Sequence, residues 1–230
     1  MAGILFIISA PSGSGKSTLV GELRKYVEGL EFSVSYTTRE PRGSEENGRE
    51  YNFTTRENFE RMIENDSFLE WAKVFGNYYG TARSALTLAA EHGRDLLLDI
   101  DVQGAMQVME RMPDAVSIFI LPPGPKVLET RLRNRSAAEH MTDEAVIERR
   151  LRQARGELQF VGKYGFAIVN DVLDTAAAEM RSIVLQARGM ATDDDVVLAD
   201  SCRTKHAPER VRGVLEQFEK EPMAPIRETV

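Results

Sequence analysis

The chain has 230 residues, of which 42% are hydrophobic, so it can bury the core of one large α/β domain or of a core with inserted lobes. Its 29 Lys and Arg and 36 Asp and Glu residues give a net charge of −7, which argues against a general binder of nucleic acids or acidic membranes. The single cysteine, Cys202, excludes an intramolecular disulfide, and no apolar run approaches the roughly 18 residues that span a bilayer. We therefore expect a cytoplasmic protein without nucleic-acid or membrane partners, and its oligomeric state stays open.

The chain begins with a predicted strand, a turn of small residues and a predicted helix. Residues 4–8 form an apolar run that is typical of a buried strand and leads straight into the turn, so it is not a signal peptide. Between Leu19 and Leu30 the apolar residues recur at spacings of three and four, which predicts a helix. The turn, residues 10–17, has the sequence APSGSGKS. The segment therefore has the order that a phosphate-binding loop requires.

The residues of this turn suit a nucleoside triphosphate. Gly13 and Gly15 allow the backbone to curl with its N–H groups toward anionic oxygens, and the N-terminus of the following helix adds partial positive charge. Lys16 can reach the terminal phosphates, and the Ser17 hydroxyl can bind Mg²⁺. The alternative, a surface turn rich in glycine and serine, does not account for the flanking strand and helix.

Residues 35–81 predict a small lobe of short antiparallel pieces inserted into an α/β domain. The helix of this lobe is predicted to open with a capping box made by Thr54 and Glu57 and to end near residue 65. A hairpin turn is predicted at residues 76–77. A polar loop covers residues 37–50. Three strand-like stretches cover residues 32–36, 51–53 and 68–75.

Helices and strands alternate regularly after residue 81, which predicts a parallel sheet with helices on both faces. The predicted strands cover residues 96–100, 116–121 and 166–169. The predicted helices cover residues 82–92, 102–112, 126–135, a segment capped by Thr142 that ends near 160, and 173–188. Beyond residue 189 the pattern weakens, and we expect a weakly ordered tail over 189–230 with one helix at 208–219.

Successive motifs resemble those of the guanylate kinase family over about residues 3–188. They are APSGSGKS (10–17), SVSYTTREPR (33–42), NGREYNF (47–53), FLEW (68–71), GNYYGT (76–81), LDIDVQG (98–104) and IVND (168–171). The resemblance implies the reaction ATP + GMP ⇌ ADP + GDP, with dGMP as a further acceptor and Mg²⁺ accompanying ATP. It also implies a parallel-sheet phosphate-loop kinase core (1–34 and 82–188), an inserted GMP-binding lobe (35–81) and a helical lid (about 131–155).

The acceptor needs a receptor for its phosphate and a reader for its base. Guanidinium groups suit phosphate, and Arg39 and Arg42 lie three residues apart in the polar loop. A carboxylate such as that of Glu70 can accept both the N1–H and the 2-amino donors of guanine, a pair that adenine lacks. Solvated loop arginines and a surface glutamate are the alternatives that the residue types leave open. The resemblance implies that the GMP phosphate is bound by Arg39, Arg42, Tyr51 and Tyr79, and that the guanine is bound by Ser35, Glu70, Thr81 and Asp101.

Acids after a predicted strand and arginines near the lid complete the expected site. Asp99 and Asp101 are predicted at the carboxyl edge of the parallel sheet, where ligands bind, although one of them could instead cap a helix. A lid that closes over ATP brings arginines to the transferring phosphoryl group and excludes water. The resemblance implies that Lys16, Arg135 and Arg150 are catalytic and that Ser17 and Asp99, the latter through water, hold Mg²⁺. It implies that ATP is bound by Ala10, Pro11, Ser12, Gly13, Ser14, Gly15, Lys16, Ser17, Thr18 and Asn170.

Two other functions agree less well with these residues. A phosphopeptide-binding module that has lost catalysis is disfavoured by the intact Gly13, Gly15, Lys16 and Ser17. A kinase of another small acceptor, such as a phosphorylated sugar, is disfavoured by Glu70 and the tyrosine and arginine set. The expected partners are therefore ATP and GMP, and the expected mechanism is positioning and charge neutralisation without a covalent enzyme intermediate.

Overall fold

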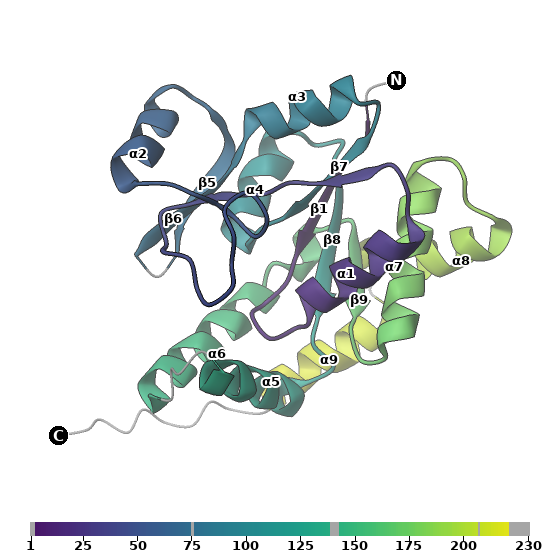
Figure 1. Ribbon diagram of the computed structural model, residues 1–230. Helices are drawn as coiled ribbons and strands as arrows, with labels where there is room; N and C mark the ends of the chain where they lie inside the picture. The colour runs from purple at the N-terminus through teal and green to yellow at the C-terminus, as the bar shows by residue number, and fades with distance from the viewer. Residues whose placement is uncertain (1–2, 75, 139–142, 207, 221–230) are drawn as a thin grey trace. The chain divides into compact units, whose positions relative to one another are not determined.

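The computed structural model describes residues 3–74, 76–138, 143–206 and 208–220, and Figure 1 shows its helices and strands. The chain divides into two compact units, and both are built from segments that are separate in the sequence. The first unit comprises Met1–Ser9 and Val27–Ser117, and the second comprises Ala10–Tyr26 and Ile118–Val230. Each unit contains parallel strands and helices, which confirms the predicted α/β class.

The parallel strands of the first unit are short and largely apolar. In β1 (Leu5–Ser9) every residue is buried. The strand β7 (Asp95–Asp99) lies between β1 and β2 (Leu30–Phe32) and pairs in parallel with both. In the chain, β7 is preceded by α3 (Arg83–Glu91) and followed by α4 (Val102–Arg111). Because β1 and β7 are parallel, the residues that follow both strands lie at one edge of the sheet, where the Ser9 hydroxyl donates to the Asp101 backbone oxygen at 3.4 Å.

A separate mixed sheet occupies the part of the first unit where short antiparallel pieces were predicted. Its strand order is β4-β3-β6-β5, and β5 and β6 form a hairpin whose turn contains Gly76 at a φ of +87°. The ring of Phe59 stacks on those of Phe68 and Tyr78, with centroid distances of 4.4 and 5.2 Å. The elements are β3 (Tyr36–Thr37), β4 (Asn52–Phe53), α2 (Arg56–Glu64), β5 (Phe68–Val74) and β6 (Asn77–Ala82).

Two local predictions for this region are wrong. The stretch 32–36 is divided between β2 and β3, because its start pairs with β7 and its end pairs with β6. The cap of α2 is Thr55, whose side chain accepts a hydrogen bond from the N–H of Asn58. Thr54 instead accepts a hydrogen bond from the Asn58 side chain at 2.7 Å, so the helix starts one residue later than expected.

The second unit contains the helix after the phosphate loop and the alternating elements near the end of the chain. The parallel strands β8 and β9 cover the predicted residues 116–121 and 166–169. The cap of α6 is Asp143, whose carboxylate accepts from the N–H of Ala145 at 2.9 Å, and the expected cap Thr142 lies outside the described residues. The elements are α1 (Lys16–Tyr26), β8 (Val116–Leu121), α5 (Pro125–Ala138), α6 (Glu144–Leu158), the 3₁₀ helix η1 (Val161–Lys163), β9 (Phe166–Val169) and α7 (Leu173–Ala187).

The segment after residue 189 is not weakly ordered in the part that the structure describes, which corrects the prediction. It forms α8 (Asp193–Ser201), the 3₁₀ helix η2 (Thr204–His206) and α9 (Glu209–Lys220), of which the sequence predicted only the last. Three aspartates occupy the first turn of α8, where negative charge is favourable, and Thr192 forms a capping box with Asp195. The acidic run therefore begins a helix. Residues 221–230 of the predicted tail lie outside the described residues.

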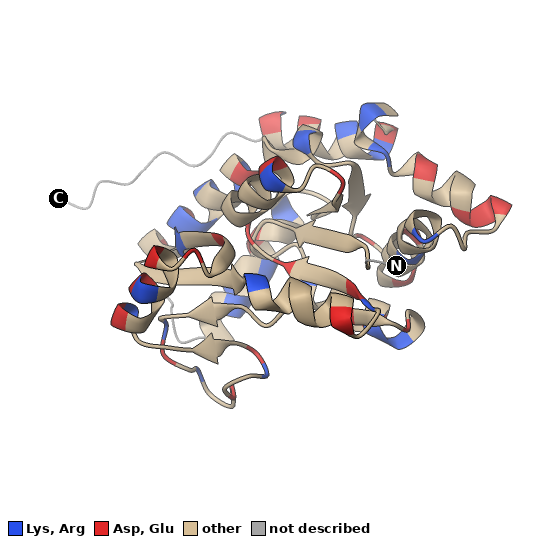
Figure 2. Cartoon of the chain, turned by 90° about the horizontal axis from the view of Figure 1, so that it is seen from above, with Lys and Arg blue, Asp and Glu red and all other residues tan. Residues whose placement is uncertain are grey.

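Charged residues of both signs are spread over the helices and loops, as the blue and red segments in Figure 2 show. Arg133 of α5 pairs with Glu129 of the same helix at 2.8 Å and with Glu144 of α6 at 2.5 Å. The second ion pair links the two helices. Within residues 3–74, 76–138, 143–206 and 208–220, no helix is both long and apolar enough to cross a membrane.

Candidate active site

The phosphate loop belongs to the second unit and is one candidate ligand site. Gly13 and Gly15 have φ angles of +90° and +85°, a left-handed conformation that other residues rarely adopt. Ser14 between them is fully buried, and its N–H donates to the Pro11 carbonyl oxygen at 3.1 Å. This curl leads directly into α1, which begins at Lys16. The loop therefore has the geometry of an anion site at a helix N-terminus.

Two side chains hold the backbone of the loop, and the sequence assigned only one of them to the site. Asn170, which follows β9, is buried, and its amide donates to the Ser14 carbonyl oxygen at 2.8 Å. Arg131 of α5 donates to the same oxygen at 3.3 Å and to the Asn170 carbonyl oxygen at 3.5 Å. A β-carbon on Gly15 would lie 2.5 Å from the Asn170 amide nitrogen, so this close contact requires glycine. The role of Arg131 escaped prediction because its contact with the loop spans 117 positions of sequence.

The arginines predicted for the lid lie on α5 and α6. Arg150 donates to the hydroxyl of the fully buried Ser136 at 3.1 Å, so its guanidinium lies against α5. Arg135 is exposed one position before Ser136, and Arg152 is exposed on α6. Residues 139–142 of the predicted lid lie outside the described residues.

Glu70 is the centre of another candidate ligand site, which belongs to the first unit. It is only 3% exposed and lies in β5, where a register shift next to it interrupts the pairing with β6. Such irregularities redirect side chains near functional sites. Burial raises the pKa of the Glu70 carboxyl to about 7, the charge of Asp101 adds to the rise, and the neighbouring hydroxyl and N–H of Thr81 oppose it.

The groups around Glu70 leave hydrogen-bonding capacity for a ligand. Thr81 of β6 pairs with Glu70 across the hairpin and is fully buried, but its hydroxyl has no partner at hydrogen-bonding geometry among the described residues. A buried hydroxyl without a partner is costly in free energy. A ligand with hydrogen-bond donors would therefore bind here and would displace few existing contacts.

Asp101 and Gly104 place Glu70 over the first turn of α4. The Asp101 carboxylate accepts from the N–H of Gly104 at 2.8 Å, so the alternative reading of Asp101 as a helix cap is confirmed. A β-carbon on Gly104 would lie 2.3 Å from Oε2 of Glu70 and 3.3 Å from Oδ1 of Asp101. Only a glycine at this position leaves room for the Glu70 carboxylate.

We expect Gly104→Ala to displace the Glu70 carboxylate, because the new methyl group would overlap it. Such overpacking lowers the free energy of unfolding by about 1–3 kcal/mol. A misplaced binding group lowers the affinity for the acceptor by about tenfold or more. Urea unfolding and the KM of the acceptor measure the two effects. The control is Gly213→Ala in α9, whose new β-carbon has no neighbour within 4 Å and which is expected to stabilise by about 0.5–1 kcal/mol. If both variants behave alike, Glu70 does not occupy this place.

Gln107 and Arg111, one turn apart on α4, bind the backbone on both sides of Glu70. The Gln107 side chain donates to the Trp71 carbonyl oxygen at 2.8 Å and accepts from the Trp71 N–H at 3.4 Å. Arg111 donates to the Leu69 carbonyl oxygen at 2.6 Å. Since β5 is the last strand of the mixed sheet, these contacts satisfy backbone groups of an edge strand. Neither residue was predicted from the sequence, in which their spacing of four on a predicted helix is the only signal.

Arg39, Tyr51 and Tyr79, three of the predicted phosphate ligands, lie together. The Arg39 guanidinium lies 5.3 Å from the centre of the Tyr51 ring, and the Tyr51 and Tyr79 rings meet edge to face at 5.8 Å. Burial is the largest influence on the pKa of Arg39 and lowers it, but hydrogen bonds to Glu45 and Tyr79 leave this pKa above its ordinary value. Burial raises the pKa of Tyr51, and the charge of Asp99 adds to the rise. Both side chains are therefore donors at neutral pH.

Glu45 organises the polar loop around these donors. Its carboxylate pairs with the Arg39 guanidinium at 2.9 Å and accepts from the backbone N–H of Arg42 at 2.9 Å. Arg42 itself is exposed. Ser35, predicted for the guanine, is half-buried and its carbonyl oxygen accepts from the N–H of Asn52 at 2.9 Å.

The oxygen groups predicted for Mg²⁺ are Ser17 and Asp99. Ser17 is exposed in the first turn of α1, and Asp99 ends β7 and is half-buried. Hydroxyl and carboxylate oxygens suit Mg²⁺, which keeps several waters and is usually bound by one or two protein groups together with phosphates. Among the described residues no three His, Cys, Asp or Glu side chains gather as a metal site.

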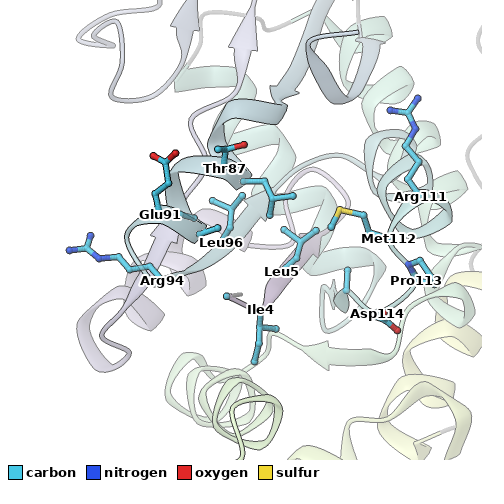
Figure 3. A pocket seen from close by; sticks show the side chains of 15 residues that line it. Ile4, Leu5, Thr87, Glu91, Arg94, Leu96, Arg111, Met112, Pro113 and Asp114 are labelled. Atoms are coloured by element: carbon cyan, nitrogen blue, oxygen red, sulfur yellow. The ribbon is translucent and has the colours of Figure 1, made fainter. Parts of the chain in front are cut away.

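A cavity of about 1050 Å³ lies elsewhere in the first unit, at the start of β1 and β7. Figure 3 shows the apolar side chains of Leu5, Leu96 and Met112 near its centre, whereas that of Arg94 extends away from it. Asp99 lies at the opposite end of the same parallel strands, so this cavity is separate from the candidate site.

Known proteins match the chain over most of its length. The family model described as Guanylate kinase matches residues 3–187. A protein named Guanylate kinase from Koribacter versatilis is 52% identical over 226 residues, which cover 95% of this chain and 97% of that protein. Another of the same name, from Desulfitobacterium hafniense, is 41% identical over 212 residues, which cover 92% of this chain and 98% of that protein. The crystal structure of guanylate kinase from Anaplasma phagocytophilum matches with a TM-score of 0.66 at 34% identity and covers 83% of this chain and 88% of that one.

Proposed function

The chain belongs to the guanylate kinase family and catalyses the ATP-dependent phosphorylation of GMP to GDP, and from this premise we propose how its two half-sites share the reaction. The phosphate loop binds ATP, and the surroundings of Glu70 bind GMP. The observation that carries this assignment is the buried Glu70 carboxylate, whose pKa is raised by burial to about 7. Guanine offers two adjacent donors to such an acceptor, whereas adenine does not.

On the donor side, the backbone N–H groups of the loop surround the ATP phosphates, and Lys16 places its ammonium near the terminal ones. Arg135 and Arg150 neutralise the charge of the transferring phosphoryl group when the lid closes. The curled backbone, the start of α1 at Lys16 and the contact of Asn170 with Ser14 support this arrangement. The residues proposed for ATP are Ala10, Pro11, Ser12, Gly13, Ser14, Gly15, Lys16, Ser17, Thr18 and Asn170.

On the acceptor side, Arg39, Arg42, Tyr51 and Tyr79 bind the GMP phosphate, and Ser35, Glu70, Thr81 and Asp101 surround the base. The cluster of Arg39 with the two tyrosine rings supports the phosphate contacts. The Thr81 hydroxyl, which lacks a partner among the described residues, supports the base contacts. We further propose that dGMP is accepted as well, as the resemblance to the family implies.

Ser17 and, through water, Asp99 are proposed to hold Mg²⁺, which when bound would neutralise charge on the ATP phosphates. No enzyme group forms a covalent intermediate in this proposal. The chain's own residues orient the two phosphates, exclude water and supply positive charge.

We further infer how the chain divides into functional parts and in which cellular compartment the protein acts. The kinase core comprises 1–34 and 82–188 with a lid at about 131–155, and residues 35–81 form the GMP-binding lobe. The mixed sheet at residues 36–82 and the link between α5 and α6 through Arg133 support this division. The buried, reduced Cys202 supports action in the cytoplasm, where thiols remain reduced.

Lowering the pH tests the assignment of Glu70. Because the folded-state pKa of this carboxyl is about 7, acid protonates it, and a protonated carboxyl cannot accept both guanine donors. We expect the KM for GMP to be lowest above pH 7 and to rise about tenfold for each unit below it, while the KM for ATP changes little. Steady-state kinetics between pH 8 and pH 6 measure both constants.

The GMP phosphate also titrates near this range, with a second pKa of about 6. Glu70→Gln separates the two effects, because it removes the protein group and leaves the phosphate. A pH profile for GMP that is the same in this variant as in the parent enzyme would contradict the assignment of Glu70.

A further inference from the structure

We propose that α9, the C-terminal helix, positions the phosphate loop for ATP, an inference that rests on the proposed function of that loop. The family model matches residues 3–187, whereas α9 covers Glu209–Lys220, so this helix lies outside the matched segment. Figure 1 shows its yellow ribbon alongside α5, and it packs against β9. Two separate series of contacts, all within the second unit, connect α9 with the loop.

The first series runs through Arg210 and the end of β9. The Arg210 guanidinium donates to the Val169 carbonyl oxygen at 3.3 Å and pairs with the buried carboxylate of Glu179 at 2.6 Å. Val169 immediately precedes Asn170, whose amide donates to the Ser14 carbonyl oxygen at 2.8 Å. Arg210 therefore fixes the backbone one residue away from the side chain that holds the loop.

The second series runs through Phe218 and α5. Phe218 packs against the buried cluster of Leu128, Leu132 and Ala154. Leu128 and Leu132 come within 3.0 Å of the position that a β-carbon on Gly13 would take, so they form the surface against which the loop rests. The Arg155 guanidinium of α6 lies over the Phe218 ring, 5.9 Å from its centre. Phe218 therefore completes the support beneath Gly13.

These contacts matter because the loop has few side chains of its own to fix its shape. Its glycines bind phosphate through backbone N–H groups, and such groups help only if the neighbouring packing keeps them in place. A small shift of Asn170 or of Leu132 would move the N–H groups away from the phosphates without unfolding the core. We therefore classify Arg210 and Phe218 as positioning residues.

The test compares the binding of the two substrates to Phe218→Ala and Arg210→Ala in the full-length chain. We expect the Kd for MgATP to rise about tenfold in each variant, while the Kd for GMP changes less than about twofold. Isothermal titration calorimetry, performed at least ten degrees below the Tm of each variant, gives both constants on folded protein. Phe218→Leu keeps an apolar contact and is expected to restore most of the affinity for ATP.

Matched controls are Arg212→Ala on the exposed face of α9 and Val197→Ala on α8, where Val197 is 71% exposed. Both are expected to bind ATP and GMP as the parent does. Equal losses of ATP and GMP affinity, or a lower Tm with unchanged affinities, would show that α9 only stabilises the fold and would overturn the proposal. Lys16→Ala tests the proposed function of the loop separately. Unchanged ATP binding in that variant would show that the loop is not the ATP site, and the inference about α9 would fail with it.

Discussion

Replacing Lys16 with alanine is expected to lower kcat for phosphoryl transfer by at least about 1000-fold while the fold remains intact. Lys16 is the first residue of α1 and directly follows Gly15, so its ammonium is carried at the end of the curled loop. The reaction needs no covalent enzyme group, and positive charge near the transferring phosphoryl group is what catalysis mainly requires. Removing one such charge therefore costs far more in rate than in stability.

A coupled assay of ADP and GDP formation measures kcat, and urea unfolding measures the free energy of unfolding. The control is Lys25→Ala near the other end of the same helix, where the ammonium is exposed and pairs with Glu22 at 2.6 Å. This exposed pair is screened by solvent and contributes little to stability, and we expect an unchanged kcat. Residual activity of Lys16→Ala within about tenfold of the parent would contradict the role proposed for Lys16.

Glu70→Gln is expected to lower kcat/KM for GMP by roughly 100- to 10,000-fold, because an amide oxygen accepts poorly where a carboxylate accepts two donors. The KM for ATP should stay near the parent value. The shape of the side chain is conserved, so the loss cannot be attributed to a cavity. Glu60→Gln on α2 is the control, since Glu60 is exposed and its nearest cation, Arg56, lies 3.9 Å away.

The same substitution should stabilise the folded protein at pH 8. Burial raises the pKa of Glu70 from 4.5 to about 7, so above pH 7 the folded state carries an ionised carboxylate that is poorly solvated. Removing this charge raises the free energy of unfolding by about 1–3 kcal/mol. The gain should shrink as the pH falls from 7 toward 4.5, because the parent carboxyl is then protonated in the folded state first. A variant that is less stable than the parent at pH 8 would show that the buried charge is not a cost.

The sequence predicted those parts of the fold that depend on local patterns. The runs 116–121 and 166–169 became β8 and β9 without change, because continuous apolar stretches of that length are typical of buried parallel strands. The strand before Gly13, the curled loop and the helix after it were also predicted from local sequence patterns. The helix α8 was not predicted, because the apolar pattern weakens beyond residue 189, although its three aspartates are favourable in the first turn of a helix.

The surroundings of the site residues could not be predicted, because they depend on contacts between distant positions. Glu70 was identified by resemblance, but its raised pKa arises from burial and from Asp101, which is brought to it by the packing of α4 on β5. The shape of the phosphate loop depends on the contact of Asn170 with Ser14, which spans 156 positions. No spacing in the sequence indicates which arginine of α5 will reach the same carbonyl oxygen.

The interleaving of the two units limits how the enzyme can be divided. The chain passes between them after Ser9, after Tyr26 and after Ser117, and the first of these junctions lies immediately before the phosphate loop. No single uninterrupted gene fragment encodes either unit. A single cut between Tyr26 and Ser117 divides both units, so two such fragments would have to rebuild both units simultaneously.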